Sequence, residues 1–301
     1  MKSFLLSIAL INSLLSFDYK LQPKEVESDI FCFFGLPEVM NKHNNGNMVN
    51  SCFVAMGTSY LVIDSGPTYQ YAKQAYEKIQ KIKKLPISYV VNTHIHDDHW
   101  LGNSFYKRQN ATIIGSSSFK ELTKKEQTRM QRRVSIEAFK GTTQEYPTLF
   151  VDDKKVLKID GEEVFIKSVN NKAHTESDLY IYIPSKKVIF AGDLVFNERL
   201  PSLRDGDING WIKALEELRS LDVVYVIGGH GEMVKKKAID FTYNYLVALR
   251  KQVKKLLDNG EDIGDVVDAV VMSEYKKVPF YDSIHRQNVE TVYRTLEWES
   301  E

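Results

Sequence analysis

The residues most suited to chemistry lie between Val90 and Asn103, in the run VVNTHIHDDHWLGN. Three of the seven histidines of the chain, His94, His96 and His99, stand there with Asp98. Neutral imidazole and carboxylate groups are the ligands that zinc and neighbouring metals prefer in proteins. The alternatives are hydrogen-bonded core histidines and a solvated acidic turn, but the clustering favours a metal site.

Three further residues of the same types follow predicted strands. His174 lies in a loop at 169–178, Asp193 ends the strand-like run at 187–193, and His230 lies in the Gly-rich end of the run at 223–232. Each of them alone is typical of a structural residue. Together with the first cluster they supply five imidazoles and two carboxylates, which is enough for two metals that share a bridging ligand.

The elements predicted around the first cluster form a strand–helix–strand unit. A strand at 60–64 ends in Asp64, a helix is expected over 68–84, and a second strand at 87–94 delivers the histidines. The chemistry then lies beyond the carboxyl end of a strand, where α/β proteins usually place their sites.

Short strands alternate through 147–190, and the region from about 233 to 301 is mainly helical by its apolar spacing. The charged segment 116–141 is expected to be a helix with a solvated face. Its Lys and Arg residues also allow a nucleic-acid surface, but intervening acidic residues favour the solvated face. His43 is expected at the surface, and His285 is expected to be structural or exposed.

The composition is that of a globular protein of one large or two modest domains, with 40 basic and 40 acidic residues. This balance predicts no nucleic-acid partner. Lys2 precedes a short apolar run at 4–15 that is too short to span a bilayer. The pattern indicates a signal peptide over 1–17 and a periplasmic or secreted protein without a stable membrane span after cleavage; an uncleaved anchor or a buried helix are the alternatives.

The only two cysteines, Cys32 and Cys52, lie in neighbouring apolar segments. Export would allow them to pair. The alternative of two buried, unpaired small side chains is the one that the sequence favours.

With these motifs the chain resembles the metallo-β-lactamase superfamily of metal-dependent hydrolases over nearly all of its mature length. The His-x-His-x-Asp-His run is the specific motif, and the stretch at 190–218 is similar to the subgroup of quinoprotein relay system zinc metallohydrolases. The resemblance implies an α/β fold, the four-layer αββα sandwich. It divides the chain into a catalytic domain at 18–235 and a helical C-terminal extension at 236–301 packed on the same domain.

The resemblance also implies a division of the ligands between two metals. His94, His96 and His174 hold the first metal, Asp98, His99 and His230 hold the second, and Asp193 bridges both. Asp64 supports the histidine loop. The metals are expected to be two Zn²⁺ ions, with iron or manganese as alternatives.

The function implied is hydrolysis of a small ester, thioester or amide by a hydroxide activated between two metals. Asp98 and Asp193 are expected to orient the attacking water or carry its proton. The alternatives are β-lactamase activity, an iron-dependent oxidoreductase of the persulfide dioxygenase type, and a metal-binding protein without activity. Substrate selection is expected from loops 35–48, 116–147 and 195–210. Candidate lining residues are Trp100, Tyr106, Asn197, Arg199, Arg204 and Trp211; the oligomeric state stays open.

Overall fold

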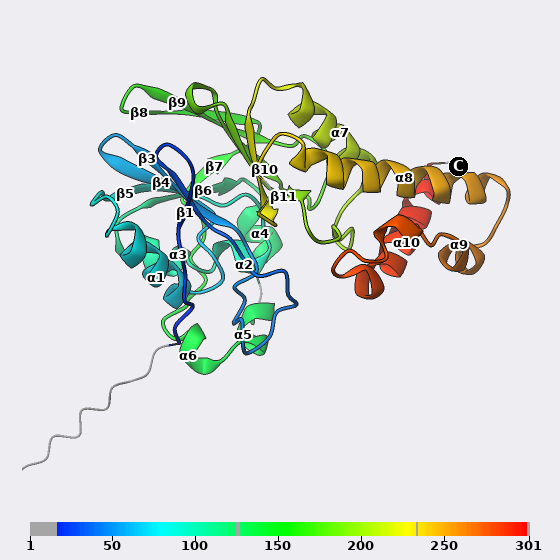
Figure 1. Cartoon of the computed structure of the whole chain (residues 1–301), viewed down its shortest axis with the longest axis horizontal. Coiled ribbons are helices and arrows are strands. Elements are labelled where there is room, and N and C mark those ends of the chain that lie inside the picture. The colour runs from blue at the N-terminus through cyan, green and yellow to red at the C-terminus, as the bar shows by residue number, and fades with distance from the viewer. Residues whose placement is uncertain (1–16, 125–126, 233, 300–301) are drawn as a thin grey trace, which may run out of the picture.

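Two β-sheets lie face to face, and helices cover both outer faces (Figure 1). This computed structural model describes residues 17–124, 127–232 and 234–299. The predicted αββα sandwich with C-terminal helices is confirmed by this layering. The expected signal peptide falls almost entirely outside the described residues. Within them, no helix is both long and apolar enough to cross a membrane.

The first sheet has seven strands in the order of the sequence. The first four strands pair antiparallel, and the last four pair parallel. Its strands are β1 Lys24–Glu27, β2 Ile30–Phe33, β3 Ser51–Met56, β4 Ser59–Ile63, β5 Ile87–Val91, β6 Thr112–Ser116 and β7 Leu149–Val151.

The second sheet has five strands in the order β12-β11-β10-β9-β8. Only β11 and β12 pair parallel, so their carboxyl ends reach the same edge of the sandwich. The strands are β8 Lys154–Ile159, β9 Glu162–Ser168, β10 Leu179–Ile183, β11 Val188–Phe196 and β12 Tyr225–His230.

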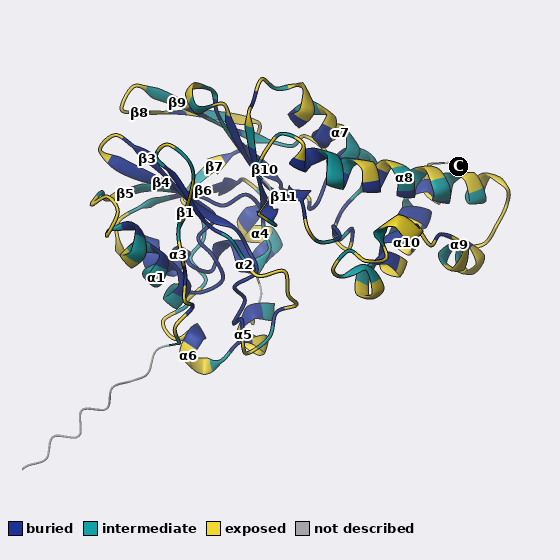
Figure 2. Ribbon diagram, in the orientation of Figure 1, coloured by how far each residue is buried: buried dark blue, intermediate teal, exposed yellow. Residues whose placement is uncertain are grey.

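The core between the sheets consists mainly of aliphatic side chains with little or no exposed surface. Val54, Leu61 and Ile114 of the first sheet belong to the same buried cluster as Ile166 and Ile181 of the second. Figure 2 shows the inner strands as largely buried. Burial of apolar surface on this scale is the main term that holds two sheets together.

The helices beside the first sheet are α1 Tyr69–Ile79, α2 Asp97–Trp100, α3 Asn103–Arg108, α4 Phe119–Thr123, α5 Arg129–Arg133 and α6 Ile136–Phe139. α1, α3 and α6 share a separate, aromatic-rich cluster with the sheet. Trp100 of α2, Phe119 of α4 and Met130 of α5 belong to a further, smaller cluster. The helix predicted over 68–84 is therefore present but shorter, and its Thr68 side chain caps it by accepting from Tyr71 N.

The other outer layer and the C-terminal extension consist of α7 Ile208–Ser220, α8 Ala238–Asp258, α9 Ile263–Ala269 and α10 Tyr281–Trp298, with 3₁₀ turns at Pro184–Lys186 and Ser273–Tyr275. Buried residues of α8 and α10 belong to the same cluster as residues of β11 and α7. In Figure 1 the far end of α8 extends beyond the sandwich together with α9 and α10.

Three sequence expectations are corrected. The charged segment 116–141 does not form one helix but the three short helices α4, α5 and α6. The strand before Asp193 does not end there: it shifts register around Gly192 and continues to Phe196. Cys32 and Cys52, which are direct partners on β2 and β3, form a disulfide rather than remaining unpaired, because the antiparallel register places them opposite one another.

Candidate metal centre

The histidine loop begins where β5 leaves the first sheet. His94 and His96 lie between β5 and α2, and Asp98 and His99 lie within α2, which begins at Asp97. His174 comes from the loop between β9 and β10. Two adjacent strands of the second sheet contribute Asp193 from β11 and His230 as the last residue of β12. The edge of the sandwich therefore brings all seven side chains together.

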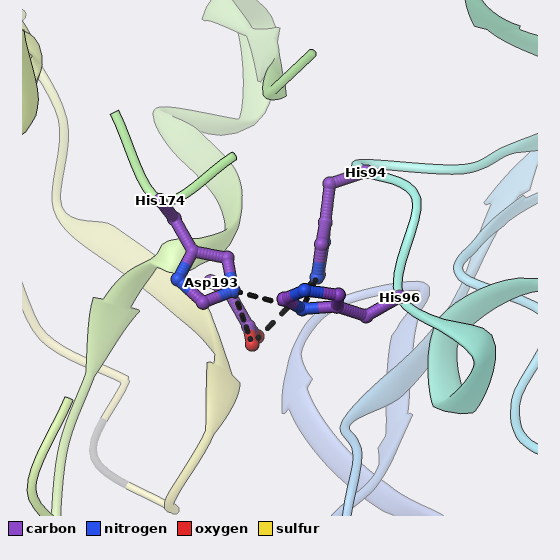
Figure 3. Close-up of side chains that lie close together, drawn as sticks. All are labelled: His94, His96, His174 and Asp193. Atoms are coloured by element: carbon purple, nitrogen blue, oxygen red, sulfur yellow. Dashed lines mark hydrogen bonds and ion pairs between the residues drawn. The ribbon is translucent and has the colours of Figure 1, made fainter. Parts of the chain in front are cut away.

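The first group consists of His94, His96, His174 and Asp193, which point toward one another (Figure 3). His96 Nδ1 lies 3.1 Å from His94 Nε2 and 3.0 Å from His174 Nε2. Asp193 Oδ2 lies 3.3 Å from His174 Nε2 and 3.7 Å from His94 Nε2. Donors of a tetrahedral zinc ion at about 2.1 Å are about 3.4 Å apart, which these separations bracket.

The second group consists of Asp98, His99 and His230. Asp98 Oδ2 lies 3.8 Å from His99 Nε2 and 4.0 Å from His230 Nε2. Asp193 reaches this group as well, with its Oδ1 3.2 Å from His99 Nε2 and its Oδ2 3.3 Å from His230 Nε2. One carboxylate thus lies between two sets of nitrogen donors.

Asp64 holds the histidine loop from behind. Its Oδ1 accepts from Thr93 N at 2.8 Å, and its Oδ2 accepts from Thr93 Oγ1 and lies 2.8 Å from His99 Nδ1. Asp64 is buried and has a φ of 54°, in the left-handed region that Asp tolerates better than most residues. The contact to Nδ1 leaves His99 Nε2 directed at the centre, and such contacts orient metal-binding imidazoles.

Two glycines allow the strands to approach the centre. A Cβ built on Gly229 would lie 1.9 Å from Asp193 Oδ1 and 3.0 Å from His99 Cε1. Gly192, with φ of 51°, stands where a Cβ would meet Thr93 Oγ1 at 2.4 Å. A Cβ at Gly229 would displace Asp193, and a Cβ at Gly192 would displace Thr93, so neither position accepts a larger residue without disturbing the centre.

His230 is oriented by the backbone. Its Nδ1 lies 2.5 Å from the Met48 carbonyl oxygen, and its ring stacks on Phe196 with the centroids 5.1 Å apart. The Arg199 guanidinium lies 3.3 Å from the same Nδ1. Since Nδ1 donates to Met48, Nε2 is the atom left to accept a metal.

Arg129 was assigned by the sequence to a solvated face, but its guanidinium reaches the centre. Its Nη2 donates to Asp98 Oδ1 and to Asp97 Oδ1, both at 2.8 Å. Asp97 Oδ2 accepts in turn from Met130 N at 2.7 Å. The acidic pair of α2 is thereby fastened to α5, and no spacing rule connects these two segments of the sequence.

Asp205 is a second residue that the sequence did not indicate. Its Oδ2 lies 2.9 Å from His96 Nε2, which leaves His96 Nδ1 for the centre. The C-terminal extension fixes the loop before it, because Asn288 of α10 accepts from Leu203 N at 2.9 Å and donates to the Pro201 carbonyl at 2.8 Å. The only signal in the sequence that could have indicated Asp205 was that it directly follows Arg204, a candidate lining residue.

The protonation of the centre differs from residue to residue. Burial lowers the pKa of His96 to about 4, against the raising effect of Asp205, and burial also lowers the pKa of His94 and His230. Burial acts in the same direction on His99, but Asp193, Asp64 and Asp98 outweigh it and raise its pKa. Burial would raise the pKa of Asp98, but Arg129, His99 and His230 hold it below its usual range.

The donor set fits a pair of metal ions. His99 Nε2 and Asp193 Oδ1 are buried and lie 3.2 Å apart, but neither makes a hydrogen bond of good geometry among the described residues, although buried polar atoms are normally satisfied. Donors held this close without a hydrogen bond are the arrangement expected of ligands that share an ion. Nitrogen and carboxylate donors without sulfur suit zinc, iron or manganese.

The other expected residues lie at different distances from the centre. Trp100 and Arg204 line the pocket outside His96, and Trp211 packs on His174 with the centroids 5.0 Å apart. Tyr106 does not line the site, because it is buried in the core behind the first sheet. Asn197 lies beside the end of β12, where its N donates to the His230 carbonyl at 3.2 Å. His43 is exposed as expected, and His285 is a buried structural residue whose Nδ1 lies 3.0 Å from Tyr245 Oη.

Comparison with known proteins agrees with this geometry. The model of the metallo-β-lactamase superfamily matches residues 44–230, and the chain therefore belongs to that superfamily. A type 2 metallo-β-lactamase of Bacillus sp. (strain 170) is 24% identical over 209 residues, covering 67% of this chain and 75% of its own. That of Bacillus cereus is 25% identical over 196 residues, covering 63% and 70%.

Two solved structures share the fold. A metallo-β-lactamase from Pontibacter korlensis superposes with a TM-score of 0.62 at 19% identity, over 75% of this chain and 99% of that one. A stereoselective inverting sec-alkylsulfatase from Pseudomonas sp. superposes with a TM-score of 0.71 at 18% identity, over 91% of this chain and 50% of that one. The second match reaches into the helical extension, which the family match at 44–230 does not.

Proposed function

We propose that the chain is a zinc-dependent hydrolase of a small ester, thioester or amide, with two metal ions per chain. The observation that carries the proposal is the convergence of seven buried or half-buried donors in two adjoining groups that share Asp193. In this proposal His94, His96 and His174 hold the first ion, Asp98, His99 and His230 hold the second, and Asp193 bridges them.

Bound there, two divalent ions would lower the pKa of a water toward about 7 and polarise the scissile carbonyl. The chain itself supplies orientation. Asp98 has one oxygen fixed by Arg129, so Oδ2 is the atom that would bind the second ion and orient the attacking water beside it. The lowered pKa of Asp98 makes the carboxylate a weak base, which favours this orienting role over uptake of the proton. Asp193 lies between both groups and would orient the same water.

The test is metal analysis of the purified protein combined with turnover of thioesters, lactones, amides, phosphodiesters and cephalosporins. Two zinc ions per chain and hydrolysis of an ester or thioester are expected, and the His230→Ala variant should retain about one ion. Less than one ion per chain after reconstitution, with no turnover, excludes the proposal. Iron in the fresh protein, with oxygen consumed in the presence of a persulfide, supports the oxidoreductase instead.

Alkyl sulfates belong in the same panel as a second candidate substrate class. The alkylsulfatase from Pseudomonas sp. matches 91% of this chain, including part of the helical extension. Release of inorganic sulfate would assign the centre to sulfate-ester hydrolysis. Hydrolysis of the cephalosporin alone, out of the whole panel, would assign the centre to the activity for which the Bacillus relatives are named.

The organisation proposed is a signal peptide at 1–17, a catalytic domain at 18–235 and a helical extension at 236–301, in a periplasmic or secreted protein. The disulfide between Cys32 and Cys52 supports export, because such bonds persist in oxidising compartments. The cluster shared by α8, α10 and β11 supports packing of the extension on the same domain. Sequencing the N-terminus of protein recovered from the periplasm or medium tests the cleavage site.

A further inference from the structure

A pocket opens in front of His96. Of the seven candidate ligands, His96 has the most exposed side chain, at 17%, whereas the others expose 5% or less. The residues that line the pocket include His96, Asp97 and Trp100 from the histidine loop and α2, together with Lys172, Thr175 and Arg204 from later loops. Of the seven candidate ligands, only His96 is among the described residues that line this pocket.

Positive charge dominates the wall of this pocket. Among the described residues, five basic and three acidic side chains line it, which leaves an excess of two positive charges in that set. The basic residues are Arg129, Arg132, Arg133, Lys172 and Arg204, and the acidic ones are Asp97, Glu176 and Asp205. A concave surface lined by one sign of charge concentrates ligands of the opposite sign.

The acidic side chains are already engaged. Asp97 is bound by Arg129, and Asp205 by Arg204, at 2.8 Å and 2.5 Å. Glu176 lies 3.8 Å from Lys172. These pairs neutralise three of the five basic groups locally.

Arg132 and Arg133 are the two basic groups left over. They end helix α5, are exposed, and have no carboxylate within 4 Å in the part of the chain that the structure describes. The preceding residues of the same helix are fixed by the bonds from Arg129 and Met130 N to Asp97. α5 therefore has a defined position relative to the centre, and its last two residues are exposed and line the pocket.

From this arrangement we infer that the substrate is an anion, whose carboxylate, sulfate or phosphate group is bound by Arg132 and Arg133 while its scissile bond reaches the centre past His96. The inference rests on the proposed function and adds the substrate class. A planar guanidinium presents paired N–H donors that match the oxygens of each of these groups. The test distinguishes between the three anions.

The first measurement compares 4-nitrophenyl hydrogen glutarate with its methyl ester, two substrates that differ in one charge. The wild-type protein should have the higher kcat/KM for the acid, mainly through a lower KM. In the double variant Arg132→Gln/Arg133→Gln the preference should fall at least about tenfold, as expected when a hydrogen-bonded charge is lost. The kcat/KM for the methyl ester, which lacks the anionic group, should fall by much less than that for the acid. Added salt should reduce the wild-type preference, because exposed charges are screened.

The matched control is Arg219→Gln/Arg294→Gln, which removes two partly or fully exposed arginines outside the pocket and changes the net charge equally. It should keep the wild-type preference. An equal fall in both double variants overturns the inference, since net charge alone would then explain it. A wild-type protein that hydrolyses both esters equally also overturns it, while leaving the proposed hydrolase function intact.

The second measurement is calorimetric titration of metal-free and zinc-loaded protein with glutarate, dimethyl glutarate, inorganic sulfate and phosphate. At least one anion should bind the wild-type protein, with an affinity at least about tenfold lower in Arg132→Gln/Arg133→Gln. The strongest of the three anions identifies the group. Because metal-free protein is included, this result stands even if no hydrolysis is found. No anion binding by the wild-type protein, or equal affinity in the variant, overturns the inference.

Discussion

Arg129 Nη2 donates to Asp98 Oδ1 at 2.8 Å, so that Asp98 Oδ2 alone faces His99 and His230. The same guanidinium binds Asp97 through Nε and Nη2. Asp98 is thus restricted to one free oxygen by a residue on another helix. The positive charge also withdraws electron density from the carboxylate, which weakens it as a metal donor. The two effects oppose one another.

We expect orientation to dominate, since loss of a residue that positions a metal ligand typically costs 10–100-fold in metal affinity. Arg129→Met should lower affinity for the second metal position by about tenfold or more, with little change at the first. Competition with a chromophoric chelator measures both affinities. Arg129→Lys keeps the positive charge but loses the planar guanidinium that binds both carboxylates. Its metal affinity should lie between those of Arg129→Met and the wild type. Tighter binding in Arg129→Met would show that charge withdrawal dominates.

Gly229→Ala should abolish occupancy of at least one metal position. Its Cβ would lie 1.9 Å from Asp193 Oδ1, so the bridging carboxylate must move. Elemental analysis gives the stoichiometry, and circular dichroism shows whether the fold persists. The control is Gly264→Ala, where a Cβ meets only Asp262 Oδ1 at 3.2 Å. Two bound metals in Gly229→Ala would contradict the placement of Asp193.

Metal binding should release a proton from His99. Burial opposes its charge, but Asp193, Asp64 and Asp98 raise its pKa above 6.5, so the metal-free imidazole is protonated at and somewhat above that pH. A metal must displace this proton, and affinity at the second position therefore increases as the pH rises toward the raised pKa. His94, His96 and His230 have lowered pKa values and are neutral at pH 7.

Calorimetry in two buffers of different ionisation enthalpy measures this proton. About one proton per chain should be released as the second position fills, and filling the first position should release fewer. Heats that do not depend on the buffer would rule out a protonated His99.

Asn288→Ala should weaken both folding and the centre. The change removes bonds to Leu203 N and to the Pro201 carbonyl, and leaves buried backbone groups unpaired. The free energy of unfolding should fall by roughly 1–3 kcal/mol, as measured by chemical denaturation. Metal affinity at the first position should fall too, since the loop carries Asp205 to His96. Gln287→Ala, an exposed neighbour on the same helix, is the control. Unchanged metal affinity in Asn288→Ala would show that the helical extension does not influence metal binding at the centre.

Apolar alternation predicted individual strands, whereas the layers were expected only from the resemblance to the superfamily, which rested on the local His-x-His-x-Asp-His spacing. The sequence also singled out His174, Asp193 and His230, since each stands near the end of a recognisable strand. Their role as ligands remains a proposal. The pairing of Cys32 with Cys52 could not be read from spacing, because it depends on the register of β2 against β3.

Arg129 and Asp205 were missed for a physical reason. Each touches the centre through a side chain whose partner is distant in sequence, Asp98 in one case and His96 in the other. A charged residue in a polar segment gives the same sequence pattern whether its side chain faces solvent or binds a buried partner. Only the path of the chain, with α5 folded back on α2 and the loop before α7 held by α10, distinguishes the two.

The seven donors belong to opposite halves of the sandwich. His94, His96, Asp98 and His99 follow a strand of the first sheet, whereas His174, Asp193 and His230 follow or lie on strands of the second. A bound metal pair would therefore act as a cross-link between the two sheets at one edge. There the sheets would be held by metal–ligand bonds, whereas apolar contacts hold them in the interior. Its removal should let that edge open, with faster deuterium exchange at the ends of β5 and β12 than at their centres.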